Sequence, residues 1–220
     1  MRRQKKFGTM SIRKQERTSK RYWINRLVAL KRIIADQEIA DILLVWDGFK
    51  PAAMVELSYF PRLKFSRKEF YKKIGDLEKI LQKLNLKYRL QVNYPKRKKE
   101  VTRYSYVARN QRKLKEIIAA DAEINTKKRR LKVGLLLGYP KTAIHAFANS
   151  KVLNRFPSYV LKREELKFLN FRLSKHWKEE LVYLKRKAEV IKRIVPDLYI
   201  KIIKGSKKIR QFRDVSRSSS

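Results

Sequence analysis

The sequence predicts an α+β fold, in which a small mixed or antiparallel sheet with flanking helices is followed by a helical C-terminal half. Two segments alternate polar and apolar residues with the period of a strand, and the apolar spacing after Glu165 has the period of a helix. The chain has 220 residues, 43% of them hydrophobic, which is enough for a sizeable core. We therefore expect a basic disordered arm over 1–20, an α+β core domain over 21–150, a helical region over 151–204 and a basic disordered tail over 205–220.

The first predicted helix has one amphipathic stripe, with Ser19 available as its cap. The stripe steps by four, three and four residues through Trp23, Leu27, Leu30 and Ile34. The run "ILLVW" (42–46), which Asp47-Gly48 stops, fits a buried strand as well as the end of a helix. We predict a strand there, and a further strand in "AMVELSYF" after Pro51.

The next helix begins at a capping box, "SRKE" (66–69). In this motif the serine side chain accepts from the N3 amide, and the glutamate side chain accepts from the backbone amide of the N-cap serine. Two alternating strands follow, in "KYRLQVN" (87–93) and "VTRYSYVAR" (101–109), and the "YPKRKKE" between them is predicted to form a hairpin tip. The helix that precedes these strands has one apolar face: Phe70, Ile74, Leu77, Leu81 and Leu84.

The back half is predicted to be helical. A helix from about Asn110 to Ile124 leads into "KKRR", and a longer helix follows Glu165 and ends near Pro196. The stripe of the longer helix is Leu166, Leu169, Leu173, Trp177, Leu181, Leu184, Ala188 and Ile191. Its opposite face is mostly basic, with Lys175, Lys178, Lys185, Arg186, Lys192 and Arg193.

The stretch "VGLLLGYPKTAIHAF" (133–147) is predicted to contain a bend between two short helices. Gly138 suits the left-handed residue that ends one helix, and Pro140 suits the first turn of the next. A functional alternative is that Tyr139 and Lys141 form an anion site, because the free amides of a helix start attract anions. The side chains expected to pack the two helices together are Leu135, Leu136, Leu137, Ile144 and Phe147.

The segment "WDGFKPAA" (46–53), followed by a helix, two strands, a helix and then "GLLLGYPKTAIHAF", resembles an archaeal family of uncharacterised proteins. In that family a DGLKPA-like segment precedes an LGYP segment that is usually followed by paired cysteines. Thr142 and Ala143 stand where those cysteines are expected, so the chemistry of paired thiols is absent. The resemblance covers 42–147 and implies a prokaryotic, intracellular protein. It carries over no catalytic residue.

The formal net charge is +38, from 58 Lys and Arg against 20 Asp and Glu. A compact chain with this excess repels itself unless a polyanion or condensed counterions offset it. Residues 62–115 carry nineteen basic and four acidic side chains and residues 151–220 carry twenty and seven, whereas residues 23–61 are close to neutral. We therefore expect the near-neutral apolar blocks to form the core, and a nucleic acid or an anionic membrane to be the partner.

RNA binding through phosphate contacts, in a ribosome-associated setting, is the function that the sequence favours. Tyr104 and Tyr106 flank the basic hairpin, where they would either stack on unpaired bases or simply cover the sheet. The predicted nucleic-acid contacts are these two tyrosines and three basic clusters: Lys96, Arg97, Lys98 and Lys99; Lys127, Lys128, Arg129 and Arg130; and Lys204, Lys207, Lys208 and Arg210.

Three alternatives stay open. DNA binding explains the same charge, and no zinc-finger, basic-zipper or RRM signature decides between the two nucleic acids. A membrane-surface protein would use the basic face of the last long helix. An enzyme of unknown reaction would use the segments 46–53 and 138–147, but their spacing specifies no nucleophile and base. The titratable side chains of these segments are Asp47, Lys50, Tyr139 and His145.

The chain has no cysteine and only two histidines, so we expect neither a metal nor a cofactor. The basic N-terminal stretch reaches no apolar h-region and is not a secretory signal, although a transit peptide stays an alternative. No run approaches the roughly 20 apolar residues that a membrane span needs. A cytoplasmic protein without a membrane span is therefore expected.

Overall fold

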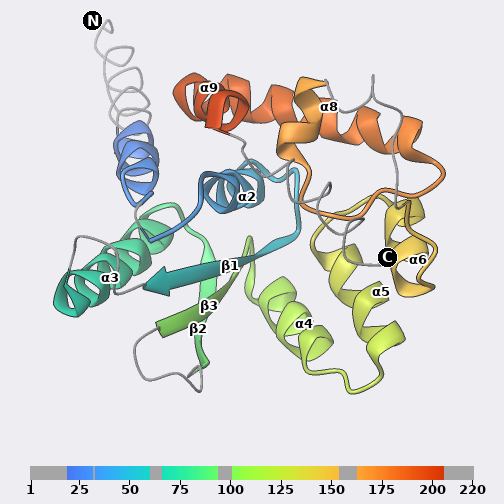
Figure 1. Ribbon diagram of the computed structural model, residues 1–220. Coiled ribbons are helices and arrows are strands. Elements are labelled where there is room, and N and C mark those ends of the chain that lie inside the picture. Colours follow the sequence, from blue (N-terminus) through green and yellow to red (C-terminus); the bar gives the residue numbers. More distant parts are fainter. Residues whose placement is uncertain (1–18, 32, 60–65, 94–100, 154–162, 206–220) are drawn as a thin grey trace, which may run out of the picture.

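The computed structural model describes residues 19–31, 33–59, 66–93, 101–153 and 163–205 (Figure 1). It confirms the α+β fold, with a small antiparallel sheet flanked by helices and a helical C-terminal half. The sheet has the order β1-β3-β2, so β3 lies at its centre and pairs with both neighbours. The three strands are β1 (Ala52–Tyr59), β2 (Lys87–Asn93) and β3 (Val101–Ala108), and each was predicted.

Helices make up most of the rest of the described chain. They are α2 (Asp36–Asp47), α3 (Arg67–Lys83), α4 (Gln111–Asp121), α5 (Thr126–Leu136), α6 (Lys141–Ala148), α8 (Trp177–Ile194), α9 (Pro196–Gly205) and the short 3-10 helix η1 (Glu164–Phe168). Residues 19–28 are helical as well, as predicted. Ser19 lies within that helix and is therefore not its cap. Of the predicted stripe, Leu27, Leu30 and Ile34 are buried and Trp23 is half-buried, but the helix ends at residue 28, before Leu30 and Ile34.

The two faces of the sheet belong to different apolar clusters. Val55 and Leu57 of β1 face the main core, together with α2, α3 and the C-terminal helices. Ala52 of β1 and Tyr106 of β3 face a smaller cluster with α4. Figure 1 shows α2 and α4 on opposite sides of the sheet. The alternation of side chains along each strand therefore separates one large core from one small one.

The prediction of a strand at 42–46 was wrong, because these residues form the C-terminal part of α2. Every residue from Ile39 to Val45 is buried. The helix lies between the sheet on one side and α8 and α9 on the other, so it needs apolar or paired side chains all round. Gly48, with a φ of 91°, ends it in the left-handed conformation.

The capping box and apolar face of α3 were predicted correctly. Ser66 Oγ accepts from the Glu69 amide at 3.2 Å, and Glu69 Oε2 accepts from the Ser66 amide at 2.6 Å. Two of the four free amides at the helix start are thereby satisfied. The predicted stripe from Phe70 to Leu84 is buried in the main core.

The single long helix predicted after Glu165 was also wrong in its first part. η1 covers Glu164–Phe168, an irregular segment follows, and α8 begins only at Trp177. The irregular segment covers residues 169–176. Within it the amide and hydroxyl of Ser174 both donate to the buried Glu180 carboxylate, at 2.8 and 2.5 Å. The predicted end near Pro196 is correct, since α8 ends at Ile194.

The predicted arm over 1–20 and tail over 205–220 lie outside the described residues, apart from residues 19, 20 and 205. Among the described helices, none combines the length with the apolar composition that crossing a bilayer requires.

Candidate functional site

The predicted bend between α5 and α6 is present. Gly138 has a φ of 70°, and its amide donates to the Leu135 carbonyl at 3.0 Å. Pro140 stands at the N-cap of α6, one residue earlier than predicted, and its carbonyl accepts from the Ile144 amide at 3.0 Å. A Cβ at Gly138 would lie 3.1 Å from Pro51 Cδ, so the bend also packs against the start of β1.

The packing between α5 and α6 differs from the prediction. Leu135 is 51% exposed and Phe147 is 42% exposed, so neither is enclosed between the two helices, although the Phe147 ring contacts Arg130 of α5. The helices meet instead at Gly134 and Ile144, where a Cβ on the glycine would lie 2.8 Å from Ile144 Cγ1. This close approach places Phe147 at the surface, next to α5.

Beneath the bend lies a buried ionic cluster formed by Asp41, Lys50 and Lys187. Lys50 Nζ is 2.9 Å from Asp41 Oδ2, and Lys187 Nζ is 3.0 Å from Asp41 Oδ1. The two lysine side chains are 0% and 1% exposed. Lys187 also donates to the Phe168 carbonyl at 3.1 Å, and Asn170 donates to Asp41 Oδ2 at 2.7 Å. One carboxylate is therefore shared by two ammonium groups.

This balance of charge shifts two pKa values. Burial lowers the pKa of Lys50 to about 8, although the attraction of Asp41 opposes the shift. Burial by itself would raise the pKa of Asp41, but the nearby ammonium groups of Lys187 and Lys50 outweigh it and hold that pKa below its ordinary value. Because two cations share one anion, the cluster favours a charged Asp41 and disfavours a charged Lys50.

A chain of aromatic rings connects this cluster to the bend. Lys50 Nζ lies 5.2 Å from the centre of the Tyr139 ring, and that ring lies 5.2 Å from the ring of Phe171. Phe171 contacts Tyr183 edge to face, with 5.9 Å between ring centres. Burial raises the pKa of both tyrosines, and the Asp41 carboxylate adds to the effect, so both remain neutral phenols.

Tyr139 and Lys141, the residues of the predicted anion site, have different surroundings. Tyr139 packs on Phe171 beside Lys50, whereas Lys141 is exposed in the first turn of α6. Of the residues considered for catalysis, Lys50 and Tyr139 are therefore brought together. Asp47 instead pairs with Arg193 at 2.8 Å, and His145 is exposed on α6.

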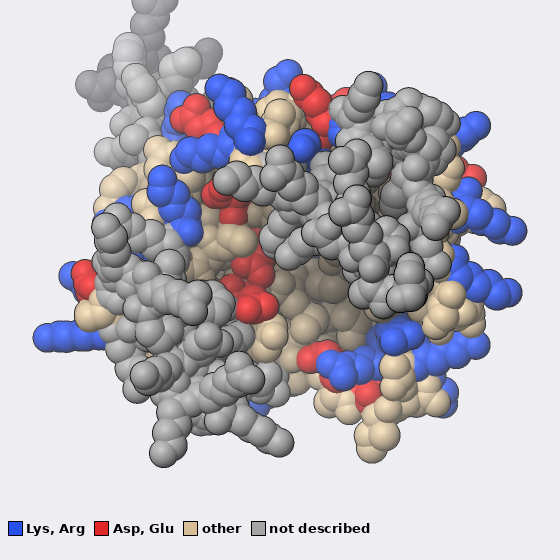
Figure 2. All heavy atoms as spheres, viewed as in Figure 1, with Lys and Arg blue, Asp and Glu red and all other residues tan. Residues whose placement is uncertain are grey.

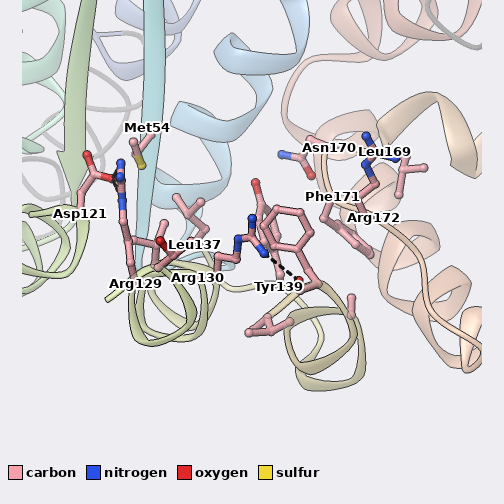
Figure 3. A pocket seen from close by; sticks show the side chains of 16 residues that line it. Met54, Asp121, Arg129, Arg130, Leu137, Tyr139, Leu169, Asn170, Phe171 and Arg172 are labelled. Atoms are coloured by element: carbon pink, nitrogen blue, oxygen red, sulfur yellow. Dashed lines mark hydrogen bonds and ion pairs between the residues drawn. The ribbon is translucent and has the colours of Figure 1, made fainter. Parts of the chain in front are cut away.

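A cavity of about 720 Å³ opens between α5, α6 and the segment 169–172. Its apolar wall is formed by Met54, Val133, Gly134, Leu137, Ala143, Ile144 and Leu169. Its remaining lining is aromatic or polar: Asp121, Thr126, Arg129, Arg130, Tyr139, Phe147, Asn170, Phe171 and Arg172. Figure 3 shows Asp121 and Arg129 on one side of the cavity, Asn170, Phe171 and Arg172 on the other, and Arg130 between them.

The arginines around the cavity differ in their contacts. Arg129 binds Asp121 through Nε and Nη2, at 3.0 and 2.6 Å. Arg130 places its guanidinium 4.8 Å from the centre of the Phe147 ring. Arg172 is exposed at the opposite wall. Among the described residues that line the cavity, three arginines stand against one carboxylate, that of Asp121, so this part of the lining has an excess of positive charge.

Some of the predicted nucleic-acid contacts lie on the described surface, and the others lie outside the described residues. Lys127, Lys128 and Arg129 are exposed in the first turn of α5, with Arg130 half-buried beside them, and Lys204 is exposed near the end of α9. Outside the described residues lie Lys96, Arg97, Lys98, Lys99, Lys207, Lys208 and Arg210.

The two predicted stacking residues do not behave alike. Tyr106 is 3% exposed and donates its hydroxyl to Asp121 Oδ2 at 2.5 Å, so it covers the sheet and is not available to a base. Burial and this hydrogen bond raise its pKa. Tyr104 is half-buried on the same face of β3.

Several residues of the site were missed by sequence reasoning, although one carried a signal. Lys187 lies three residues after Leu184 and four before Ile191, so the apolar stripe itself places a lysine on the buried face of α8. Asp41 lies inside the apolar part of α2, and a carboxylate buried at such a position needs a cation as its partner. Glu180 accepts from Thr142 Oγ1 at 2.8 Å, which connects α6 to α8. No feature of the sequence pointed to Asn170 or Arg172 as residues of the site.

Comparison of the chain with family models, with curated proteins and with solved structures finds no match.

Proposed function

We propose that the chain binds RNA through phosphate contacts made by exposed Lys and Arg side chains. The net charge of +38 must be compensated, and among the lysines and arginines whose burial the structure describes, Lys50 and Lys187 are the buried ones. The two fully buried lysines share one carboxylate. Most of the described lysines and arginines therefore remain at surfaces that a polyanion can reach.

The observation that carries the proposal is the first turn of α5. Lys127, Lys128 and Arg129 follow Thr126 there, and the turn contains no acidic residue. The partial positive charge of a helix N-terminus disfavours cations at these positions, by about 0.3–1 kcal/mol each. An RNA phosphate placed beside them would remove this repulsion and would bond to the free amides as well.

A second basic surface is the outer face of α8, which was predicted from its spacing. Lys178, Lys185, Arg186 and Lys192 are exposed on it. Figure 2 shows Lys and Arg side chains along the side of the molecule that α8, α6 and α5 occupy. Since the positive charge extends over several helices, we extend the proposal to a large, folded RNA in a cytoplasmic, ribosome-associated setting.

DNA is the alternative, because phosphate contacts alone do not distinguish the two nucleic acids. The cavity beside α5 favours RNA. It is concave, partly apolar and lined by aromatic and guanidinium groups, which suits the unpaired bases that folded RNA presents in its loops.

The test is the salt dependence of RNA affinity, measured by fluorescence anisotropy on the whole chain. A variant with Lys127→Gln and Lys128→Gln should reduce the slope of log affinity against log salt by about 1.4, since each lost contact to single-stranded RNA is worth about 0.7. The control carries Lys72→Gln and Lys79→Gln, two exposed lysines of α3, and loses the same charge. Salt-independent binding, or an equal loss of slope in both variants, would contradict a contact at α5.

A further inference from the structure

We propose that the cavity between α5, α6 and the segment 169–172 binds one unpaired nucleotide of a single-stranded RNA, with its base inside and its phosphate at the arginines. This inference rests on the proposed RNA binding and adds to it a site that selects unpaired bases.

The size and wall of the cavity suit a nucleobase. A volume of about 720 Å³ falls within the range of small-molecule sites. Val133, Leu137 and Ile144 give the interior an apolar surface, which favours a flat ring over a hydrated ion. The close contact of Gly134 with Ile144 fixes the wall, because neither helix can move toward the other.

The aromatic groups provide planes on which a base can stack. Phe147 is 42% exposed and lines the cavity, with the guanidinium of Arg130 over its ring at 4.8 Å. Phe171 lines the opposite wall, where Tyr139 holds its ring in place. Rings and guanidinium planes are the usual stacking partners of unpaired bases in RNA.

The charge of the lining suits one phosphate. Among the described lining residues, the carboxylate of Asp121 is bound by Arg129. Arg130 lies between the two walls of the cavity and places a guanidinium there beside Phe147 (Figure 3). Guanidinium groups bind phosphate in a bidentate manner, so a nucleotide with its base in the interior would have its phosphate compensated at the rim.

A paired base cannot enter this site. In a duplex the base is stacked on both faces and its edge is hydrogen-bonded, so that reaching a concave site requires unpairing it. The cavity should therefore distinguish single strands from duplexes, which phosphate contacts alone do only weakly.

The experiment compares Phe147→Ala with Tyr71→Ala, a matched control on α3 whose aromatic ring is 41% exposed and lies outside the cavity. Affinities are measured for a single-stranded RNA 12-mer, for a 12-base-pair RNA duplex and for adenosine monophosphate. Phe147→Ala should weaken single-strand binding at least about fivefold, because loss of a stacking partner has at least this effect, and should change duplex binding less than about twofold. Tyr71→Ala should change neither. Phe147→Leu, which keeps the apolar contact with α5, should reproduce the loss if the aromatic plane matters.

The outcomes separate the two proposals. If the chain binds both RNAs in a salt-dependent manner and Phe147→Ala leaves their ratio unchanged, the RNA-binding proposal stands and the nucleotide site is overturned. If neither RNA binds, the RNA-binding proposal fails. Binding of adenosine monophosphate that is sensitive to Phe147→Ala would then keep the site and identify a free nucleotide as its ligand. Binding of none of the three probes overturns both.

Discussion

Two neighbouring groups of cations meet at Asn170, which lines the cavity and donates to Asp41. On the buried side, Lys50 and Lys187 are enclosed around one carboxylate, with side chains 0% and 1% exposed. At the cavity, Arg129 is 50% exposed and Arg130 lies over a surface phenylalanine. The same charge thus has two roles: enclosed lysines join α2 to α8, whereas we propose that Arg130, at an open cavity, contacts a ligand. The predictions below test this contrast.

The largest effect is expected from Asp41→Asn. The substitution leaves two buried ammonium groups without their shared carboxylate, and breaking a buried pair by removing one partner costs about 3–5 kcal/mol. The free energy of unfolding, measured by urea denaturation at pH 7, should fall by this amount. Asp76→Asn is the control, because the surface pair that Asp76 makes with Arg26 at 3.8 Å should contribute less than about 1 kcal/mol. Equal effects of the two substitutions would contradict a buried ionic cluster.

The next effect concerns pH. Because the pKa of Lys50 is lowered to about 8 from its ordinary 10.5, the unfolded chain binds more protons than the folded one between these values. The cost of burying the charged amine is fully present below pH 8 and is relieved as the pH rises to 10.5. The unfolding free energy of the native chain should therefore rise across this window, relative to that of Lys50→Met, by on the order of 3 kcal/mol.

Lys72→Met, at an exposed lysine of α3, is the control and should keep the rise. If Lys50→Met follows the same pH curve as the native chain, Lys50 is not the group that titrates.

A smaller effect is expected at the bend above the cluster. Gly138→Val places a β-branched side chain at a φ of 70° and brings Cβ to 3.1 Å from Pro51 Cδ. Unfolding free energy should fall by more than about 1 kcal/mol. In Gly75→Val, by contrast, the added Cβ meets no atom within 4 Å, so stability should change little. Unchanged melting of Gly138→Val would show that the left-handed residue is dispensable.

The parts of the fold that local spacing determines could be predicted from the sequence. The strands alternate, α3 begins at a capping box, and Gly138 takes the left-handed conformation that its position before Pro140 suggested. The errors arose where tertiary packing decides. The C-terminal part of α2 is a continuous apolar run because the helix is enclosed on both sides, and a run of this kind looks like a buried strand. The long stripe after Glu165 is interrupted over residues 169–176, where Ser174 bonds to the side chain of Glu180, six residues further along the chain.

The candidate site could be predicted only in part. The basic clusters were visible as runs of lysine and arginine, and the bend was visible as Gly-Tyr-Pro. The cavity was not, because its walls come from Met54, from the segment 121–147 and from 169–172, which only the fold brings together. The exposure of Phe147 and the burial of Tyr106 likewise depend on which helix covers each ring.

The contrast between enclosed and open cations is tested most directly by measuring stability and RNA affinity together for Lys50→Met and Arg130→Met. Arg130→Met should lower the affinity for single-stranded RNA and reduce its salt slope by about 0.7, while changing the unfolding free energy by less than about 0.5 kcal/mol. Lys50→Met should abolish the rise in stability between pH 8 and 10.5 and leave RNA affinity within about twofold of the native value. The reverse pattern, with RNA affinity lost in Lys50→Met and retained in Arg130→Met, would contradict the account.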